Sequence, residues 1–197
     1  TVGHGLGVAP ASVIVKRRNS VNNWRVGHNG LTNWTYRINL ESTDAQSQQT
    51  NVWNSTAPSS SVFSIGTSSS VNGSSGTYVA YCFSEVAGYS KFGSYTGNGS
   101  SDGPFVFTGF RVAWLMTKRT DGTTPWRIFD SKRPNANFQT YKLEADSFGA
   151  ELTGYPYADF LSNGFKIRDN GSYQNANGGT YVYLAFAESP FKNARAR

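Results

Sequence analysis

Two short apolar runs, each followed by Lys-Arg and a turn-rich segment, dominate the pattern of hydrophobic and polar positions in this chain. Residues 13–15 (Val-Ile-Val) precede Lys16-Arg17, and residues 115–117 (Leu-Met-Thr) precede Lys118-Arg119. A buried strand that emerges into water ends in such residues. Each run then passes through polar turn residues to a Trp-Arg-aliphatic segment. Each pattern therefore predicts a β-hairpin.

Two further segments are apolar on both of their alternating faces. They are residues 78–83 (YVAYCF) and 181–186 (YVYLAF). A strand of this kind is typical of the interior of a sheet, with both faces covered. Residues 159–169 predict another hairpin, with Asn163-Gly164 at its bend. No amphipathic helix of ten or more residues is expected.

The hairpin patterns belong to an internal repeat with a nearly constant offset. Lys16 recurs as Lys118 (118 − 16 = 102), and Trp24 recurs as Trp126 (126 − 24 = 102). The Gly-Thr-Tyr-Val string that begins at Gly76 returns 103 residues later, which one inserted residue explains. An internal repeat indicates that the fold is built from copies of one structural unit. Here it consists of two long units, unlike the many short units of a solenoid.

The fold class follows from this pattern together with the composition. The sequence has 197 residues, of which 15% are aromatic and 15% charged, and it contains 21 glycines. Many turns and short strands favour an all-β protein. We expect an antiparallel β-sandwich, jelly-roll or lectin-like, because stacked sheets bury their aromatic faces. Residues 1–93 form the first β repeat and 94–197 the second, and the sequence leaves open whether they make one continuous sandwich or two domains.

Charge and cysteine content narrow the range of partners. The formal net charge is +6, but the basic residues are scattered, so we expect no nucleic-acid binding and only a mild preference for anionic partners. The single cysteine, Cys82, lies in an apolar run and is interpreted as a small buried hydrophobe. No run of 18 apolar residues predicts a membrane span.

Catalytic motifs are absent from the sequence. It has two histidines and no metal-ligand spacing, nucleophile elbow or phosphate-binding loop. A glycosidase needs a pair of carboxylates. The acids that recur with their context, Glu85 and Glu188, are interpreted as structural partners of a Lys or Arg, with Lys16 and Lys118 as candidates. We therefore expect no enzyme activity, no metal site and no cofactor.

Candidate binding residues are aromatic side chains in segments that do not repeat, because repeated aromatic residues are expected in the core. Ordinary core packing is the competing interpretation for each of them. These binding candidates are Trp34, Tyr36, Trp53, Tyr155 and Tyr157.

Several longer strings resemble a known family. They are "HGLGVAP", "VIVKRR", "TYVAYCFSEVAGYSKFGSYTGNGSSDGPFVFTGFR", "DFLSNGFKIR" and "GTYVYLAFAESPFKNAR". Together they resemble a C-terminal, β-rich, tail-fibre-like domain of virion proteins from tailed bacteriophages and marine viruses, over nearly the entire chain. The resemblance implies a component on the exterior of the virion that contacts other virion proteins. It also implies a homo-oligomer, with a trimer expected because fibres are commonly trimeric.

Two functions fit these expectations. The first is a tail-fibre or appendage module that recognises host-surface glycan without cleaving it. The alternative is a structural virion protein, such as a capsid decoration protein, head fibre or connector, that acts through protein contacts. A glycan-degrading spike is disfavoured because no carboxylate pair is common to both halves.

Overall fold

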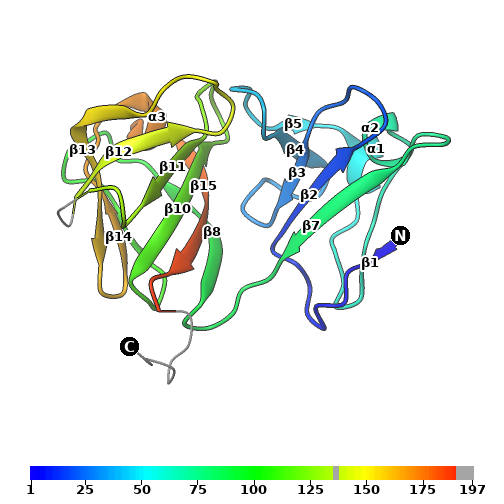
Figure 1. The fold of residues 1–197 in the computed structure, drawn as a ribbon, viewed down its shortest axis with the longest axis horizontal. Coiled ribbons are helices and arrows are strands. Elements are labelled where there is room, and N and C mark those ends of the chain that lie inside the picture. The colour runs from blue at the N-terminus through cyan, green and yellow to red at the C-terminus, as the bar shows by residue number, and fades with distance from the viewer. Residues whose placement is uncertain (135–137, 190–197) are drawn as a thin grey trace.

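The chain folds into two β-sheet halves that pack side by side and are joined by the segment between β7 and β8 (Figure 1). The structure is a computed structural model that describes residues 1–134 and 138–189. All strand pairs within these residues are antiparallel. The prediction of an antiparallel, all-β sandwich is confirmed.

The N-terminal half contains a five-stranded sheet of order β5-β4-β3-β2-β7 and a two-stranded ribbon. The sheet strands are β2 (Ser12–Arg17), β3 (Arg25–His28), β4 (Tyr36–Asn39), β5 (Ser47–Gln48) and β7 (Tyr78–Phe83). The ribbon pairs β1 (Val2–Gly3) with β6 (Val62–Phe63), and the short helices are α1 (Thr50–Trp53) and α2 (Ser69–Asn72).

The C-terminal half is an eight-stranded sheet of order β8-β15-β10-β11-β12-β13-β14-β9. Its first four strands in sequence are β8 (Ser90–Thr96), β9 (Phe105–Phe107), β10 (Val112–Arg119) and β11 (Arg127–Asp130). The others are β12 (Phe138–Glu144), β13 (Leu152–Leu161), β14 (Gly164–Ile167) and β15 (Thr180–Ala187), with helix α3 (Ser172–Asn175) before the last. The sheet curls on itself, which brings the rings of Tyr95 on β8 and Phe165 on β14 to within 6.2 Å of each other.

All three predicted hairpins are confirmed. They are β2–β3, β10–β11 and β13–β14. In the third, Leu161 pairs with Gly164, so Ser162 and Asn163 make the turn. Gly164 also allows β9 to approach, since a Cβ there would lie 2.2 Å from the carbonyl oxygen of Val106.

The prediction of two interior strands is right for one segment and wrong for the other. β15 lies between β8 and β10, and residues 181–185 are buried. β7 instead lies at the edge of the five-stranded sheet, where Ala80 and Tyr81 are exposed. The apolar faces of the two strands look alike in the sequence, but only β15 has cover on both sides.

The buried apolar side chains form three clusters, one in each half and one between them. The first fills the inside of the curled C-terminal sheet, and the third lies between the N-terminal sheet and the segments around α1, α2 and β6. The second lies between the halves and joins side chains from both, including Val26 and Ile38 with Trp126 and Leu184. The expected boundary at residues 93 and 94 falls within β8, all of whose residues pair with β15.

Candidate functional site

The Lys-Arg ends of β2 and β10 are held in matching strand registers. Arg17 pairs with Tyr78 of β7, and Arg119 pairs with Tyr181 of β15. Each arginine also donates a hydrogen bond through its Nε to the side chain two residues further on. The backbone around the two Lys-Arg pairs is therefore alike, and differences between them come from side chains and surroundings.

The two tyrosines anchor their strands to a short helix in the same manner. The Tyr78 hydroxyl donates to the carbonyl oxygen of Ser69 at 2.8 Å. The Tyr181 hydroxyl donates to the carbonyl oxygen of Ser172, also at 2.8 Å. Each helix therefore closes one end of its sheet beside a Lys-Arg pair.

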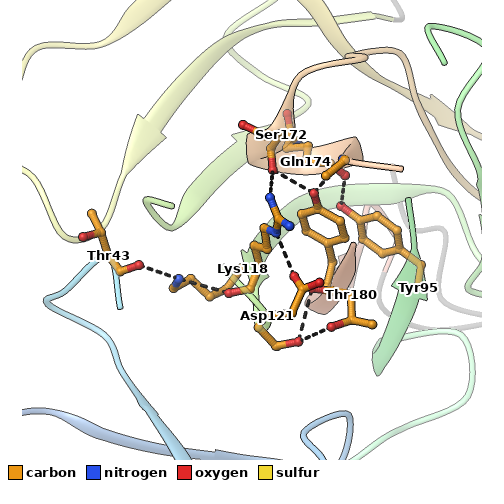
Figure 2. Close-up of polar contacts among 11 residues, drawn as sticks. Thr43, Tyr95, Lys118, Asp121, Ser172, Gln174 and Thr180 are labelled. Carbon is orange, nitrogen blue, oxygen red and sulfur yellow. Dashed lines mark hydrogen bonds and ion pairs between the residues drawn. The ribbon is translucent and has the colours of Figure 1, made fainter. Parts of the chain in front are cut away.

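In the C-terminal half, the face beside Lys118 is closed by the N-terminal half. Lys118 is buried, and its Nζ donates hydrogen bonds to the carbonyl oxygens of Thr43 (3.0 Å) and Arg119 (3.1 Å) (Figure 2). Burial lowers the pKa of Lys118 to about 8, partly opposed by the negative charges of Asp146 and Asp44. Lys118 therefore stabilises the contact between the halves and is inaccessible to a ligand.

Trp126 closes the same face. Its indole Nε1 donates to the carbonyl oxygen of Asn39 at 2.8 Å, and its ring is buried among side chains of both halves. Val182 and Leu184 of β15 lie in the same cluster. The whole face is thus occupied by packing between the halves.

The corresponding face of the N-terminal half is open. Lys16, Trp24, Val79 and Tyr81, the counterparts at offsets of 102 and 103 residues, line a groove of about 800 Å³ that opens to solvent. Its complete lining is Lys16, Arg17, Arg18, Ser20, Val21, Trp24, Val79 and Tyr81. The volume lies within the roughly 300–1,000 Å³ range of small-molecule sites.

Strand pairing explains how the lining residues come together. Lys16 pairs with Val79, and the neighbouring pair joins Ile14 to Tyr81. Side chains alternate between faces along a strand, so these residues share one face, which the C-terminal half covers only in part. Tyr81 is 46% exposed and Trp24 is partly exposed, which leaves aromatic surface available in the groove.

The cations of the groove bond to neutral groups. Lys16 Nζ donates to the carbonyl oxygen of Asn22 at 2.8 Å, and Arg17 Nε donates to Asn19 Oδ1 at 3.1 Å. Arg18 is exposed. The lining contains no carboxylate. The groove therefore combines positive charge with aromatic rings, a combination suited to binding a polar, anionic molecule.

The aromatic residues that the sequence singled out are dispersed, and the structure places none of them in the groove. Trp53 is fully buried and Tyr157 is 7% exposed, so neither can offer a ring face to a ligand. Trp34 packs edge-on against Trp53 at 5.8 Å, and Tyr36 packs against the cluster between the halves. Tyr155 is 72% exposed on β13 in the other half.

Sequence reasoning missed the groove because it assigned repeated aromatic residues to the core. Trp24 and Tyr81 occupy repeated positions, yet they lie where the second half leaves the face open. One signal was present: residues 16–19 carry more positive charge than their counterparts at 118–121.

The recurring glutamates have cationic partners, as expected, but these are not the hairpin lysines. Glu85 pairs with Lys91 at 2.7 Å, and Glu188 pairs with Arg111 at 3.0 Å. Lys91 lies on β8, and Arg111 directly precedes β10. These ion pairs lie outside the groove.

Residues 1–134 and 138–189 contain neither a metal-binding group nor a membrane-spanning helix. No group of three or more His, Cys, Asp or Glu side chains there is placed to hold a metal ion. No helix in that part of the chain is long and apolar enough to cross a membrane. Cys82 is partly buried against the third cluster, and burial raises the pKa of its thiol.

Comparison with known proteins gives one match. A family model described as "Domain of unknown function (DUF7483)" matches residues 1–190. No curated protein and no solved structure matches the chain.

Proposed function

We propose that this chain, which belongs to the DUF7483 family of domains of unknown function, is a bacteriophage virion component that recognises host-surface glycan without catalysis. In this proposal it is a module of a tail fibre or similar appendage on the exterior of the particle. Its β-rich fold and the resemblance of its sequence strings to tail-fibre-like virion domains support this role. One fold can serve many functions, so the groove is the stronger support for this role.

The observation that carries the proposal is the open groove with Trp24 and Tyr81 beside Lys16 and Arg18. Sugar rings present C–H faces that pack on aromatic rings, and sugar hydroxyls accept hydrogen bonds from ammonium and guanidinium groups. The groove lies on the face of a β-sheet, so its floor is rigid. Rigid sites lose little conformational entropy on binding.

Binding without cleavage follows from the lining. Hydrolysis of a glycosidic bond uses two carboxyl groups on either side of the bond, about 5 to 10 Å apart. The residues that line the groove include no Asp or Glu. A glycan held there would meet donors and aromatic surface but no general acid or nucleophile.

The test compares binding and cleavage of host-surface polysaccharide by purified protein. Tyr81→Ala should weaken binding while leaving the fold intact, because the ring is 46% exposed. Tyr155→Ala is the matched control, since Tyr155 is exposed in the other half, away from the groove. Loss of binding in Tyr155→Ala with unchanged binding in Tyr81→Ala would refute the groove as the glycan site.

A second candidate function, a structural virion protein, is favoured by one surface feature. Phe105 of β9 and Phe138 of β12 are 47% and 50% exposed, and strand pairing places them at the two ends of a row that runs through Lys166 and Asp159. Phe107 beside Phe105 is 61% exposed. Exposed aromatic rings around polar groups are typical of protein–protein interfaces.

This alternative predicts contacts with other virion proteins or with further copies of the chain. Sedimentation of the wild type and of Phe107→Ser would show whether the aromatic row holds a homo-oligomer, for which a trimer is expected. Symmetric incorporation into capsids without glycan binding would favour the structural role over the receptor-binding role.

A further inference from the structure

The two hairpins differ in charge at two matched positions. Residues 16–19 read Lys-Arg-Arg-Asn, and residues 118–121 read Lys-Arg-Thr-Asp. The first set has three cations and no carboxylate, a formal charge of +3, whereas the second has two cations and one carboxylate, 2 − 1 = +1. The backbone registers match, so the difference is confined to side chains.

In the C-terminal hairpin one cation is paired with a carboxylate and the other is buried away from solvent. Arg119 Nε lies 2.7 Å from Asp121 Oδ1, an ion pair that raises the pKa of the guanidinium and lowers that of the carboxyl. Lys118 Nζ bonds to two carbonyl oxygens (Figure 2). This hairpin needs no external anion.

In the N-terminal hairpin the same hydrogen bond is made without the negative charge. Asn19 occupies the position that corresponds to Asp121, and its Oδ1 accepts from Arg17 Nε at 3.1 Å. Arg18 stands where the other hairpin has Thr120, and it is exposed. Among the described residues, no ion pair within 4.0 Å involves residues 16–18.

Cations without a carboxylate partner lie beside exposed aromatic rings, and this combination indicates which kind of ligand the groove binds. Resting on the proposed function, we infer that the groove binds an acidic sugar, one that carries a carboxylate or a phosphate. The sugar ring packs against Trp24 and Tyr81. Its anionic group accepts hydrogen bonds from Lys16 and Arg18, both of which line the groove. Charge-assisted bonds of this kind are stronger than bonds between neutral groups.

The arrangement suits a sugar better than a single-stranded nucleic acid. Single-strand sites track the backbone with cations over about four or more nucleotides and stack successive bases. Here the cations are gathered in three consecutive residues at one end of β2, and the rest of the lining is Ser20, Val21 and the two rings with Val79. One anionic group can be held at this end, with apolar surface beside it.

The experiment measures binding to saccharides of matched length that differ in charge. The probes are a neutral glucose hexamer, a galacturonic acid hexamer and poly(glycerol phosphate), followed by amide chemical shifts and calorimetry. We expect the two acidic probes to shift amides of residues 16–24 and 78–81 and the neutral hexamer to bind about tenfold or more weakly. Salt should weaken acidic binding, because exposed charges are screened over about 8 Å at physiological ionic strength. Comparing the affinities of the galacturonic acid hexamer and poly(glycerol phosphate) shows whether the groove prefers a carboxylate or a phosphate.

The decisive variant installs the residues of the other hairpin. Arg18→Thr with Asn19→Asp should fold, because the C-terminal half carries these residues in the same register. It should bind acidic probes about tenfold or more weakly and lose most of the salt dependence. The control Lys132→Asp removes the same two units of charge at an exposed position in the other half and should bind within about twofold of wild type.

Other outcomes separate this inference from the proposed function. Equal binding of neutral and acidic hexamers, unchanged in the double variant, would overturn the acidic ligand and leave glycan recognition standing. Failure of every saccharide and of host-surface polysaccharide would overturn both. Tighter binding of a single-stranded DNA hexamer than of either acidic probe would make the groove a nucleic-acid site. An oligomer that Tyr81→Ala dissociates would make it a contact between copies and would also overturn the inference.

Discussion

His28 Nε2 lies 3.2 Å from the carbonyl oxygen of Tyr183, across the boundary between the two sheets. The other ring nitrogen, Nδ1, accepts a hydrogen bond from the backbone N–H of Gly30 at 2.9 Å. The neutral ring therefore carries its proton on Nε2 and donates it to Tyr183. Burial lowers the pKa of His28 to about 4, against a smaller upward effect of the Tyr183 carbonyl.

This contact predicts loss of stability in mild acid. The folded-state pKa of His28 lies below its unfolded value of about 6.5, so the unfolded chain binds more protons between the two values. The contribution of His28 is fully present above pH ~6.5 and is lost as pH falls toward ~4, by up to about 3 kcal/mol. Urea denaturation at several pH values measures the decrease.

Two histidine variants isolate this effect. His28→Gln should flatten the pH dependence in this window, whereas His4→Gln, outside the interface, should keep it. Asp146, whose pKa burial raises, contributes in the opposite direction, so the comparison between variants is more informative than the wild-type curve. A His28→Gln protein with the full wild-type slope would assign the acid sensitivity to another group.

Trp126 and Trp24 form a matched pair for testing the closed and open faces. Trp126→Ala should lower the free energy of unfolding by about 3–5 kcal/mol, because the ring is buried between the halves and its indole bonds to Asn39. Trp24→Ala should cost less than half as much and should weaken glycan binding instead. Urea denaturation and a binding titration on both variants check this, and equal stability costs would contradict the open groove.

Gly164 tests the packing of β14 against β9. A methyl group at this position would meet the Val106 carbonyl oxygen at 2.2 Å, so Gly164→Ala should destabilise the fold by about 1–3 kcal/mol. Gly3→Ala is the control, because the nearest atom to its Cβ is 3.9 Å away. Thermal unfolding of both variants is the measurement, and similar melting temperatures would argue against the close strand approach.

The recurring glutamates should matter little. Glu85 and Glu188 form ion pairs in which all four side chains are more than a third exposed, and such pairs contribute about 0–1 kcal/mol. Glu85→Gln and Glu188→Gln should therefore unfold close to wild type and bind glycan unchanged. If polysaccharide were cleaved by the wild type and not by these folded variants, the non-catalytic role would be wrong.

The hairpins could be predicted from sequence because their signals are local. The Lys-Arg ends and the turn residues report strand ends directly, although the third turn is formed by Ser162 and Asn163, one residue before the expected Asn163-Gly164. Whether a distant segment covers a strand cannot be determined from the residues of that strand alone. Residues 78–83 and 181–186 therefore have similar patterns, although the first forms an edge strand and the second an interior strand.

The burial of Trp53, one of the binding candidates, has a related cause. Trp53 does not repeat, which made it a binding candidate, with core packing as the competing interpretation. The outer face of the N-terminal sheet is covered by α1, α2 and β6 of the β1–β6 ribbon, and Trp53 on α1 is part of that cover. Conversely, Trp24 repeats a core residue but lies where that core ends.

Because the groove opens to solvent, it cannot enclose a polysaccharide, which limits the strength of any single contact. Several copies held on one particle would raise the effective concentration of free grooves around a bound chain, so avidity would exceed the affinity of one site by orders of magnitude. Attachment would then respond steeply to the density of acidic sugars on a cell surface. Dissociation of one groove at a time would let a particle move across that surface without leaving it.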